Sequence, residues 1–152
     1  MTRLETLTQD LTAAMRSGDV RRRDVVRSLL TMVKNEAIAQ KVDAAKLTDD
    51  AIIAVLKRAQ KQRADAAQQF RAGNRPELAD KEAAEAEIIA AYLPEQMSEE
   101  QIAEIVDAVI ARVGTENFGA VMGQVMAHVK GQADGATVKA IVEAKLAAQN
   151  GA

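Results

Sequence analysis

The sequence predicts an all-α protein, and three observations support this prediction. Of the 152 residues, 31 are alanine, which loses no side-chain entropy in a helix. The chain has only two prolines, two phenylalanines, one tyrosine and no tryptophan. Apolar residues recur every three or four positions, as on one face of a helix, and no stretch shows the sustained alternation of a strand. We therefore expect an aliphatic core built from Leu, Ile, Val, Met and Ala.

Two helices separated by a tight turn are predicted first. Gly18 suits the left-handed position that ends a helix, and Asp19 suits the N-cap of the next one. The first helix is expected over 2–16, with an apolar stripe of Leu4, Leu7, Leu11 and Met15. The apolar face expected for the second helix consists of Val26, Leu29, Leu30, Val33 and Ala37.

A third and a fourth helix complete the N-terminal group. Thr48 is a suitable N-cap for the third helix, where Leu47 can pack against Ile52 as a hydrophobic staple. We expect Gly73 to stop this helix and Pro76 to open the fourth. The inner stripe expected for the third helix is Ile52, Leu56, Ala59, Arg63, Ala66 and Phe70.

The segment "YLPEQMSEE" interrupts the helical pattern. Pro94 disfavours helix at the residue before it, and Ser98 with Gln101 three residues later has the spacing of a capping box. This places a domain boundary at 93–98, between an N-terminal bundle of about four helices at 1–93 and a small three-helix domain at 94–152. Three apolar stripes predict the later helices: Ile102, Ile105, Val106, Val109 and Val113; Phe118, Val121, Met122, Val125, Met126 and Val129; and Val138, Ile141, Val142 and Leu146.

The connection "KGQADG" precedes the last predicted helix. Gly131 suits a left-handed cap and Asp134 suits an N-cap, so the connection is predicted as a helix stop, a short link and a helix start. Small residues also recur four apart, a spacing that lets another helix approach closely. Their polar neighbours favour close packing within a water-soluble protein over a membrane dimer. These small residues are Gly119, Gly123, Ala127 and Gly131.

The composition excludes several kinds of site. Cysteine is absent, which excludes disulfides, thiolate nucleophiles and cysteine-based zinc sites. His128 is the only histidine, and Val125 stands where a di-iron pattern would need glutamate. No serine lies in a G-x-S-x-G turn, and no glycine-rich phosphate loop occurs. We expect a cytoplasmic protein with no catalytic residue, metal, cofactor or membrane span.

Charge is unevenly distributed, although the net charge is only −2. Residues 1–75 carry +6, residues 76–107 carry −9 and the remainder carries +1. Basic stripes can track phosphates, but interleaved acids are also typical of an ordinary solvated helix face. In the N-terminal part the candidates for nucleic-acid contact are Arg21, Arg22, Arg23 and Arg27, and Lys34 shares a face with the last two. In the C-terminal part they are Lys130, Gly131, Gly135, Lys139 and Lys145.

Two segments, "YLPEQMSEEQI" and "MGQVMAHVKGQADGATVKAIVEAKL", resemble the YqeY family. That family is related to the C-terminal tail domain of the B subunit of the glutamine-dependent Asp-tRNA/Glu-tRNA amidotransferase. "LLTMVKNEAI" and "FRAGNRPELADKEAAEAEIIAAYLPEQ" extend the resemblance over most of the chain. It implies a helical N-terminal domain and a three-helix C-terminal domain of a class that touches the tRNA body. At the matching positions it implies cap and turn roles for Gly131, Asp134 and Gly135, and a tRNA contact for Lys130.

The resemblance also implies carbon–nitrogen ligase activity with glutamine as amide donor. That reaction needs ATP to activate a carboxylate and a nucleophile to release ammonia, and the sequence shows neither a phosphate loop nor a marked nucleophile. We therefore expect a non-catalytic, tRNA-linked accessory or binding module. Two alternatives stay open. One is a participant in a tRNA amidotransferase reaction, together with amidotransferase subunits, and the other is a protein–protein adaptor that uses the acidic region 76–107.

Overall fold

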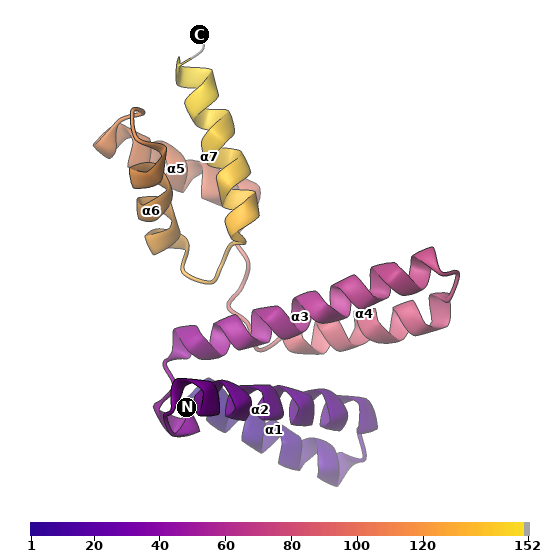
Figure 1. Cartoon of the computed structure of the whole chain (residues 1–152). Helices are drawn as coiled ribbons and strands as arrows, with labels where there is room; N and C mark the ends of the chain where they lie inside the picture. The colour runs from indigo at the N-terminus through magenta and orange to yellow at the C-terminus, as the bar shows by residue number, and fades with distance from the viewer. Residues whose placement is uncertain (151–152) are drawn as a thin grey trace. The chain divides into compact units, whose positions relative to one another are not determined.

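The computed structural model describes residues 1–150, and within that range all regular structure is helical, as predicted (Figure 1). Contacts between backbone positions divide the chain into two compact units, which we call unit 1 (Met1–Leu93) and unit 2 (from Pro94 onward). That the two units fold independently stays a prediction. In the described range every helix is too short or too polar to cross a bilayer. The elements are α1 (Arg3–Ser17), α2 (Val20–Gln40), the short 3₁₀ helix η1 (Ala44–Lys46), α3 (Asp49–Ala72), α4 (Pro76–Ala90), α5 (Glu99–Val113), α6 (Phe118–Val129) and α7 (Gly135–Asn150).

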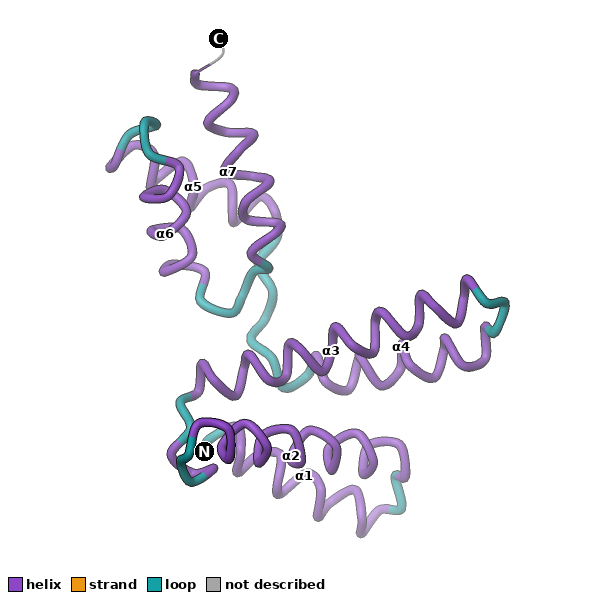
Figure 2. The backbone as a smooth tube through the Cα atoms, viewed as in Figure 1, coloured by secondary structure: helices purple, strands orange, loops and turns teal. Residues whose placement is uncertain are grey.

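Unit 1 consists of two helical hairpins, α1–α2 and α3–α4 (Figure 2). The caps predicted from the sequence are present. Gly18 has a φ of 76°, and a carboxylate oxygen of Asp19 accepts a hydrogen bond from the backbone N–H of Arg22. Thr48 Oγ1 likewise accepts from the N–H of Ala51. The core of unit 1 contains Leu7, Val25, Val26, Leu29, Val33, Ala37, Leu47, Ile52, Val55, Leu56, Ala59, Ile89 and Tyr92.

Two details of unit 1 differ from the expectation. Met15 is 57% exposed and Ala14 is buried in its place, because a period of 3.6 residues carries the inner face of α1 to position 14. Gly73 follows the last residue of α3 but has a φ of −83°. The left-handed turn is made instead by Asn74, with a φ of 59°, since asparagine also tolerates this conformation.

The far half of the α3–α4 hairpin contains no member of the main core of unit 1, whose α3 residues end at Ala59. Arg63 lies there on the predicted inner stripe. Its Nη1 is 3.3 Å from Oε2 of Glu82 and 2.9 Å from Oε2 of Glu85, a buried residue of α4. An ion pair therefore joins the two helices in the half of the hairpin that lies beyond the main core.

Unit 2 packs α5, α6 and α7 against one another. Ser98 and Gln101 form the predicted capping box at the start of α5, and Gly131 has the predicted left-handed φ of 76°. The backbone N–H of Met97 donates to the carbonyl of Gln132 at 2.7 Å, which ties the segment before α5 to the α6–α7 connection. The core contains Ile102, Val106, Val109, Ile110, Val121, Val125, Val129, Ala133, Val138, Val142 and Leu146.

The predicted close packing along the small residues of α6 is wrong. Gly119, Gly123 and Ala127 are exposed, and a Cβ atom at Gly123 would meet no other atom within 4 Å. The buried side of α6 is lined by valines, and Gly123 lies two residues from Val121 and Val125, about 200° around the helix. Phe118 is 39% exposed although it precedes Val121 and Val125 by three and seven residues and so lies on the valine face, because it is the first residue of α6.

Candidate nucleic-acid interface

The arginines at the α1–α2 corner do not form one patch. Consecutive helical residues point about 100° apart, so Arg21, Arg22 and Arg23 face different directions. Arg23 Nη2 forms an ion pair with Asp24 Oδ1 at 2.9 Å. Arg21 and Arg27 are exposed and have no ion pair within the described part of the chain. Of the four predicted arginines, these two offer the most accessible charge.

Arg22 belongs to a partly buried polar group around Tyr92. The hydroxyl of Tyr92 donates to Oδ2 of Asp10 at 2.6 Å. Burial, together with the neighbouring Asp10 carboxylate, raises the pKa of this phenol from 10.0 to about 12, and the cation of Arg22 partly offsets both effects. Arg22 Nε also lies 3.7 Å from Oδ2 of Asp19. Its guanidinium therefore contributes to the packing of unit 1.

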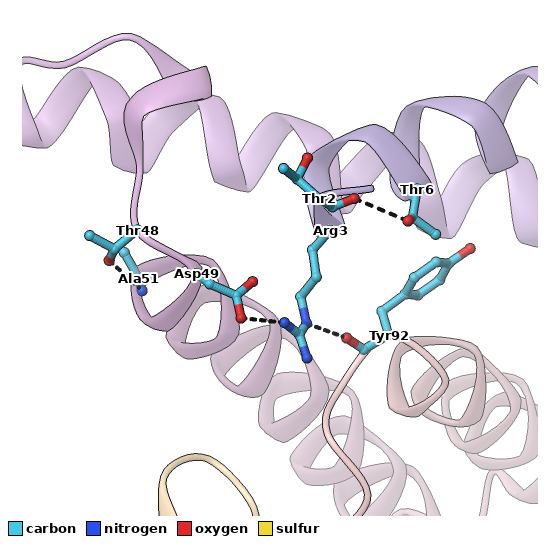
Figure 3. Close-up of polar contacts among 7 residues, drawn as sticks. All are labelled: Thr2, Arg3, Thr6, Thr48, Asp49, Ala51 and Tyr92. Carbon is cyan, nitrogen blue, oxygen red and sulfur yellow. Dashed lines mark hydrogen bonds and ion pairs between the residues drawn. The ribbon is translucent and has the colours of Figure 1, made fainter.

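A second side chain of α1, that of Arg3, binds the backbone of the same tyrosine (Figure 3). Arg3 Nε donates to the carbonyl of Tyr92 at 3.0 Å, and Arg3 Nη1 forms an ion pair with Asp49 at the start of α3. One side chain of α1 therefore contacts both the first turn of α3 and the end of unit 1. These partners are far apart in sequence, and the sequence patterns gave no local signal for them. Together the two ties fix α1 in the unit and so position the α1–α2 corner.

The predicted lysines of unit 2 differ in how accessible their charges are. Lys145 Nζ lies 3.1 Å from Oδ2 of Asp107 on α5, and Lys139 Nζ lies 3.9 Å from Oε1 of Glu143. Lys130, just after α6, is exposed and has no ion pair among residues 1–150. Gly131 makes the left-handed turn, and its carbonyl accepts a hydrogen bond from Gln96 Nε2. Gly135 is the first residue of α7, and a Cβ atom there would meet no other atom within 4 Å. Their predicted role as phosphate contacts stays a prediction.

A shallow cavity of about 130 Å³ lies between α5 and α6. Its floor is aliphatic, and the two polar residues that line it are Arg112 and His128. Arg112 Nη2 donates to Oε1 of Gln124 at 2.5 Å, which links α5 to α6. Sequence reasoning placed His128 on the surface without a partner and did not single out Arg112. Among the residues that the structure describes, no three His, Cys, Asp or Glu side chains gather as a metal site would need.

Comparison with known proteins places the chain in a family. The profile of the YqeY family, described as Yqey-like protein, matches residues 4–146. The chain therefore belongs to the YqeY family, as its sequence motifs predicted. It is also 29% identical over 134 residues to the altered inheritance of mitochondria protein 41, mitochondrial, of Pyrenophora tritici-repentis (strain Pt-1C-BFP). That similarity covers 86% of this chain and 72% of the relative. The name of the relative gives it a mitochondrial location, so a cytoplasmic location for this chain stays a prediction.

Proposed function

We propose that this chain is a tRNA-linked accessory module that binds RNA and does not itself catalyse a reaction. The observation that carries the proposal is that three of the predicted contact residues, Arg21, Arg27 and Lys130, are exposed and have no ion pair among residues 1–150. Such cations neutralise phosphates without first breaking a contact inside the protein. Membership of the YqeY family also supports RNA binding, because unit 2 resembles a tail domain that touches tRNA.

The net charge of −2 limits how strong this binding is. An overall negative protein gains little from nonspecific attraction to RNA, so the attraction comes from local patches. We therefore expect weak binding with a strong dependence on salt. If a few phosphates are neutralised, log K falls with log salt by about 0.7 to 0.9 per contact.

The proposal is tested by titrating fluorescently labelled tRNA with the full chain at low and moderate salt. Binding that weakens with salt is expected, and the variant Lys130→Glu/Lys139→Glu should bind more weakly and flatten the salt slope by about one per lost contact. Because Lys139 already lies near Glu143, most of that effect should come from Lys130. Absence of tRNA binding at either salt would overturn the proposal and favour the protein–protein adaptor.

Catalysis is tested separately. Purified chain incubated with glutamine, ATP and mischarged tRNA should release no more ammonia than a buffer control. Ammonia release that persists through rigorous purification would favour the alternative in which the chain takes part in a carbon–nitrogen ligase reaction.

A further inference from the structure

We propose that one edge of α2 is the main RNA-backbone contact of this protein. The edge carries Arg27, Lys34 and Lys41, which we call the α2 cation row. The proposal rests on the proposed function and deepens it, because it assigns the contact to unit 1, whereas the family resemblance points to unit 2. It also extends the sequence prediction, in which Arg27 was the last candidate in this region.

The row follows from helix geometry. Its members are seven residues apart, and seven residues turn an α-helix through almost two full turns, so Arg27 and Lys34 lie along one edge. Lys41 continues the same spacing at the C-cap, one residue beyond Gln40. Successive members are about 10 Å apart along the helix axis. All three are exposed, as are Thr31 and Ile38 between them. The core side of α2 is formed by other residues, Val25, Val26, Leu29, Val33 and Ala37.

The charges of the row are not neutralised within the protein. None of the three has an ion pair in the part of the chain that the structure describes. Both acidic residues within α2 have other partners: Asp24 pairs with Arg23, and Glu36 lies 3.8 Å from Arg58 of α3. In unit 2, by contrast, two of the three predicted lysines lie near carboxylates. The α2 cation row is therefore the longer run of available positive charge.

The backbone at Lys41 supports a role for its charge. Lys41 caps α2 in the left-handed conformation, with a φ of 56°, where glycine or asparagine is usual. A lysine there carries backbone strain that glycine would avoid. Its ammonium extends the row beyond the last turn of α2, where the helix dipole also favours a cation. Strained backbone is often found at functional sites, so the conformation of Lys41 adds to the motive for the proposal.

The surroundings of the row favour RNA over an acidic protein helix. A helical partner buries a continuous apolar stripe in an apolar groove. Exposed large apolar side chains occur only at the C-terminal end of the row, where Ile38 is 73% exposed and Val42 is 40% exposed, and Thr31 and Asn35 are polar neighbours. Long, flexible cations without a continuous apolar floor suit a polyanion whose charges are closely and evenly spaced, as in a nucleic-acid backbone.

The test compares three variants of the full chain that lose the same charge. The first is Arg27→Gln/Lys34→Gln/Lys41→Gln. The second is Lys130→Gln/Lys139→Gln/Lys145→Gln in unit 2. The matched control is Arg71→Gln/Arg75→Gln/Lys81→Gln, around the exposed α3–α4 turn. Each is titrated with fluorescent tRNA over a series of salt concentrations, and circular dichroism verifies that each is folded.

We expect the first variant to lose about 10- to 100-fold in affinity at low salt and to lower the salt slope by about 2 to 3. The matched control should stay within about twofold of the parent, and the unit 2 variant should lie between them. An unaltered slope in the first variant, with binding lost in the unit 2 variant, would overturn this inference and leave the proposed function standing. Failure of the parent chain to bind tRNA would overturn both. Displacement of tRNA by polyglutamate as readily as by unlabelled RNA would assign the row to an acidic protein and also overturn the inference.

Discussion

Unit 1 and unit 2 are both small helical bundles, but their helices are held in register by different contacts. In the core of unit 2, every residue except Ala133 and Leu146 is valine or isoleucine. Such β-branched side chains are restricted to one main χ1 rotamer in a helix. The core of unit 1 also contains leucines and a tyrosine, whose rotamers are less restricted. A stiff aliphatic core therefore defines one packing in unit 2, whereas the core of unit 1 defines its packing less sharply.

Unit 1 adds polar ties between elements that are distant in sequence. Arg3 and Asp10 of α1 both hold Tyr92, and Arg63 of α3 pairs with Glu85 of α4. When one member of a buried polar pair loses its partner, the remaining group is left unsatisfied, which costs stability. A shift in helix register would break these pairs and would therefore cost unit 1 more than the loss of an aliphatic contact. Two helical bundles in one chain can therefore reach a unique packing in different ways, unit 2 through stiff β-branched side chains and unit 1 through polar pairs. The following substitutions test it, from the largest expected effect to the smallest.

The largest effect is expected from Val106→Asp. Val106 is fully buried in unit 2, and a carboxylate placed there without a partner costs several kcal/mol, on the order of the stability of a small domain. Unit 2 should unfold while unit 1 stays folded. The circular dichroism spectrum should lose only the helical signal of unit 2, and limited proteolysis should cut from the segment 93–98 onward. The control is Val113→Asp, which should be nearly neutral because Val113 is 40% exposed. If unit 1 unfolded as well, the two units would share one cooperative core.

Arg63→Met should destabilise unit 1 by about 2 kcal/mol, because it leaves the buried Glu85 carboxylate without its cation in the far half of the α3–α4 hairpin. Urea unfolding measures the loss. Adding Glu85→Leu should recover much of it, since an apolar pair can replace an ion pair of similar volume. Arg71→Met, which breaks an exposed pair with Asp80, is the control and should cost less than about 0.5 kcal/mol. Equal losses for the two arginines would contradict the role given to Arg63.

Tyr92 should make the stability of unit 1 depend on pH above 10. Its pKa is raised from 10.0 to about 12 in the folded state, so the folded state holds the phenolic proton more tightly than the unfolded state. The resulting stabilisation is complete below pH 10 and is lost as pH rises through 12, a loss of about 2 to 3 kcal/mol. Since the chain has one tyrosine and no tryptophan, the absorbance of phenolate follows this titration directly. Tyr92→Phe should lack this component of the pH dependence, and a titration of the folded parent near 10 would contradict the buried tie to Asp10.

The smallest effects compare two neighbours in unit 2. Gly131→Val should lower stability by about 1 to 2 kcal/mol, because a β-branched residue is strained at a φ of 76°. Lys130→Ala should change the melting temperature very little, since the side chain is exposed and has no ion pair among the described residues. A larger melting shift for Lys130→Ala than for Gly131→Val would reverse the assignment of turn and surface.

Much of the fold was predictable because its signals are local. Thr48, Ser98 and Gly18 each act on backbone groups within a few residues, so their roles follow from spacing alone. The errors arose where a choice between neighbours depends on tertiary packing. Nothing local distinguishes Met15 from Ala14 as the residue facing the core, or shows that the glycines of α6 face away from the other helices of unit 2.

The candidate site was less predictable, because the availability of a charge depends on its partners. Lys145 pairs with Asp107 from another helix, which spacing along the chain does not reveal. Arg22 likewise interacts with Tyr92, which comes from a distant segment. Lys139 is different: Glu143 follows it by four residues, the ordinary spacing of a helical ion pair, so the sequence already contained that signal.

The double tie on Tyr92 also has a consequence for synthesis on the ribosome. Arg3 and Asp10 are 89 and 82 residues from the tyrosine that they hold. A chain grows at about 5 to 20 residues per second, so roughly 4 to 16 s pass between the synthesis of Asp10 and the synthesis of Tyr92. During that interval α1 and α2 can pair only with each other and with the growing α3. Unit 1 therefore completes its polar contacts late in translation, and the nascent chain exposes the partly apolar inner face of the first hairpin to chaperones until Tyr92 has left the exit tunnel.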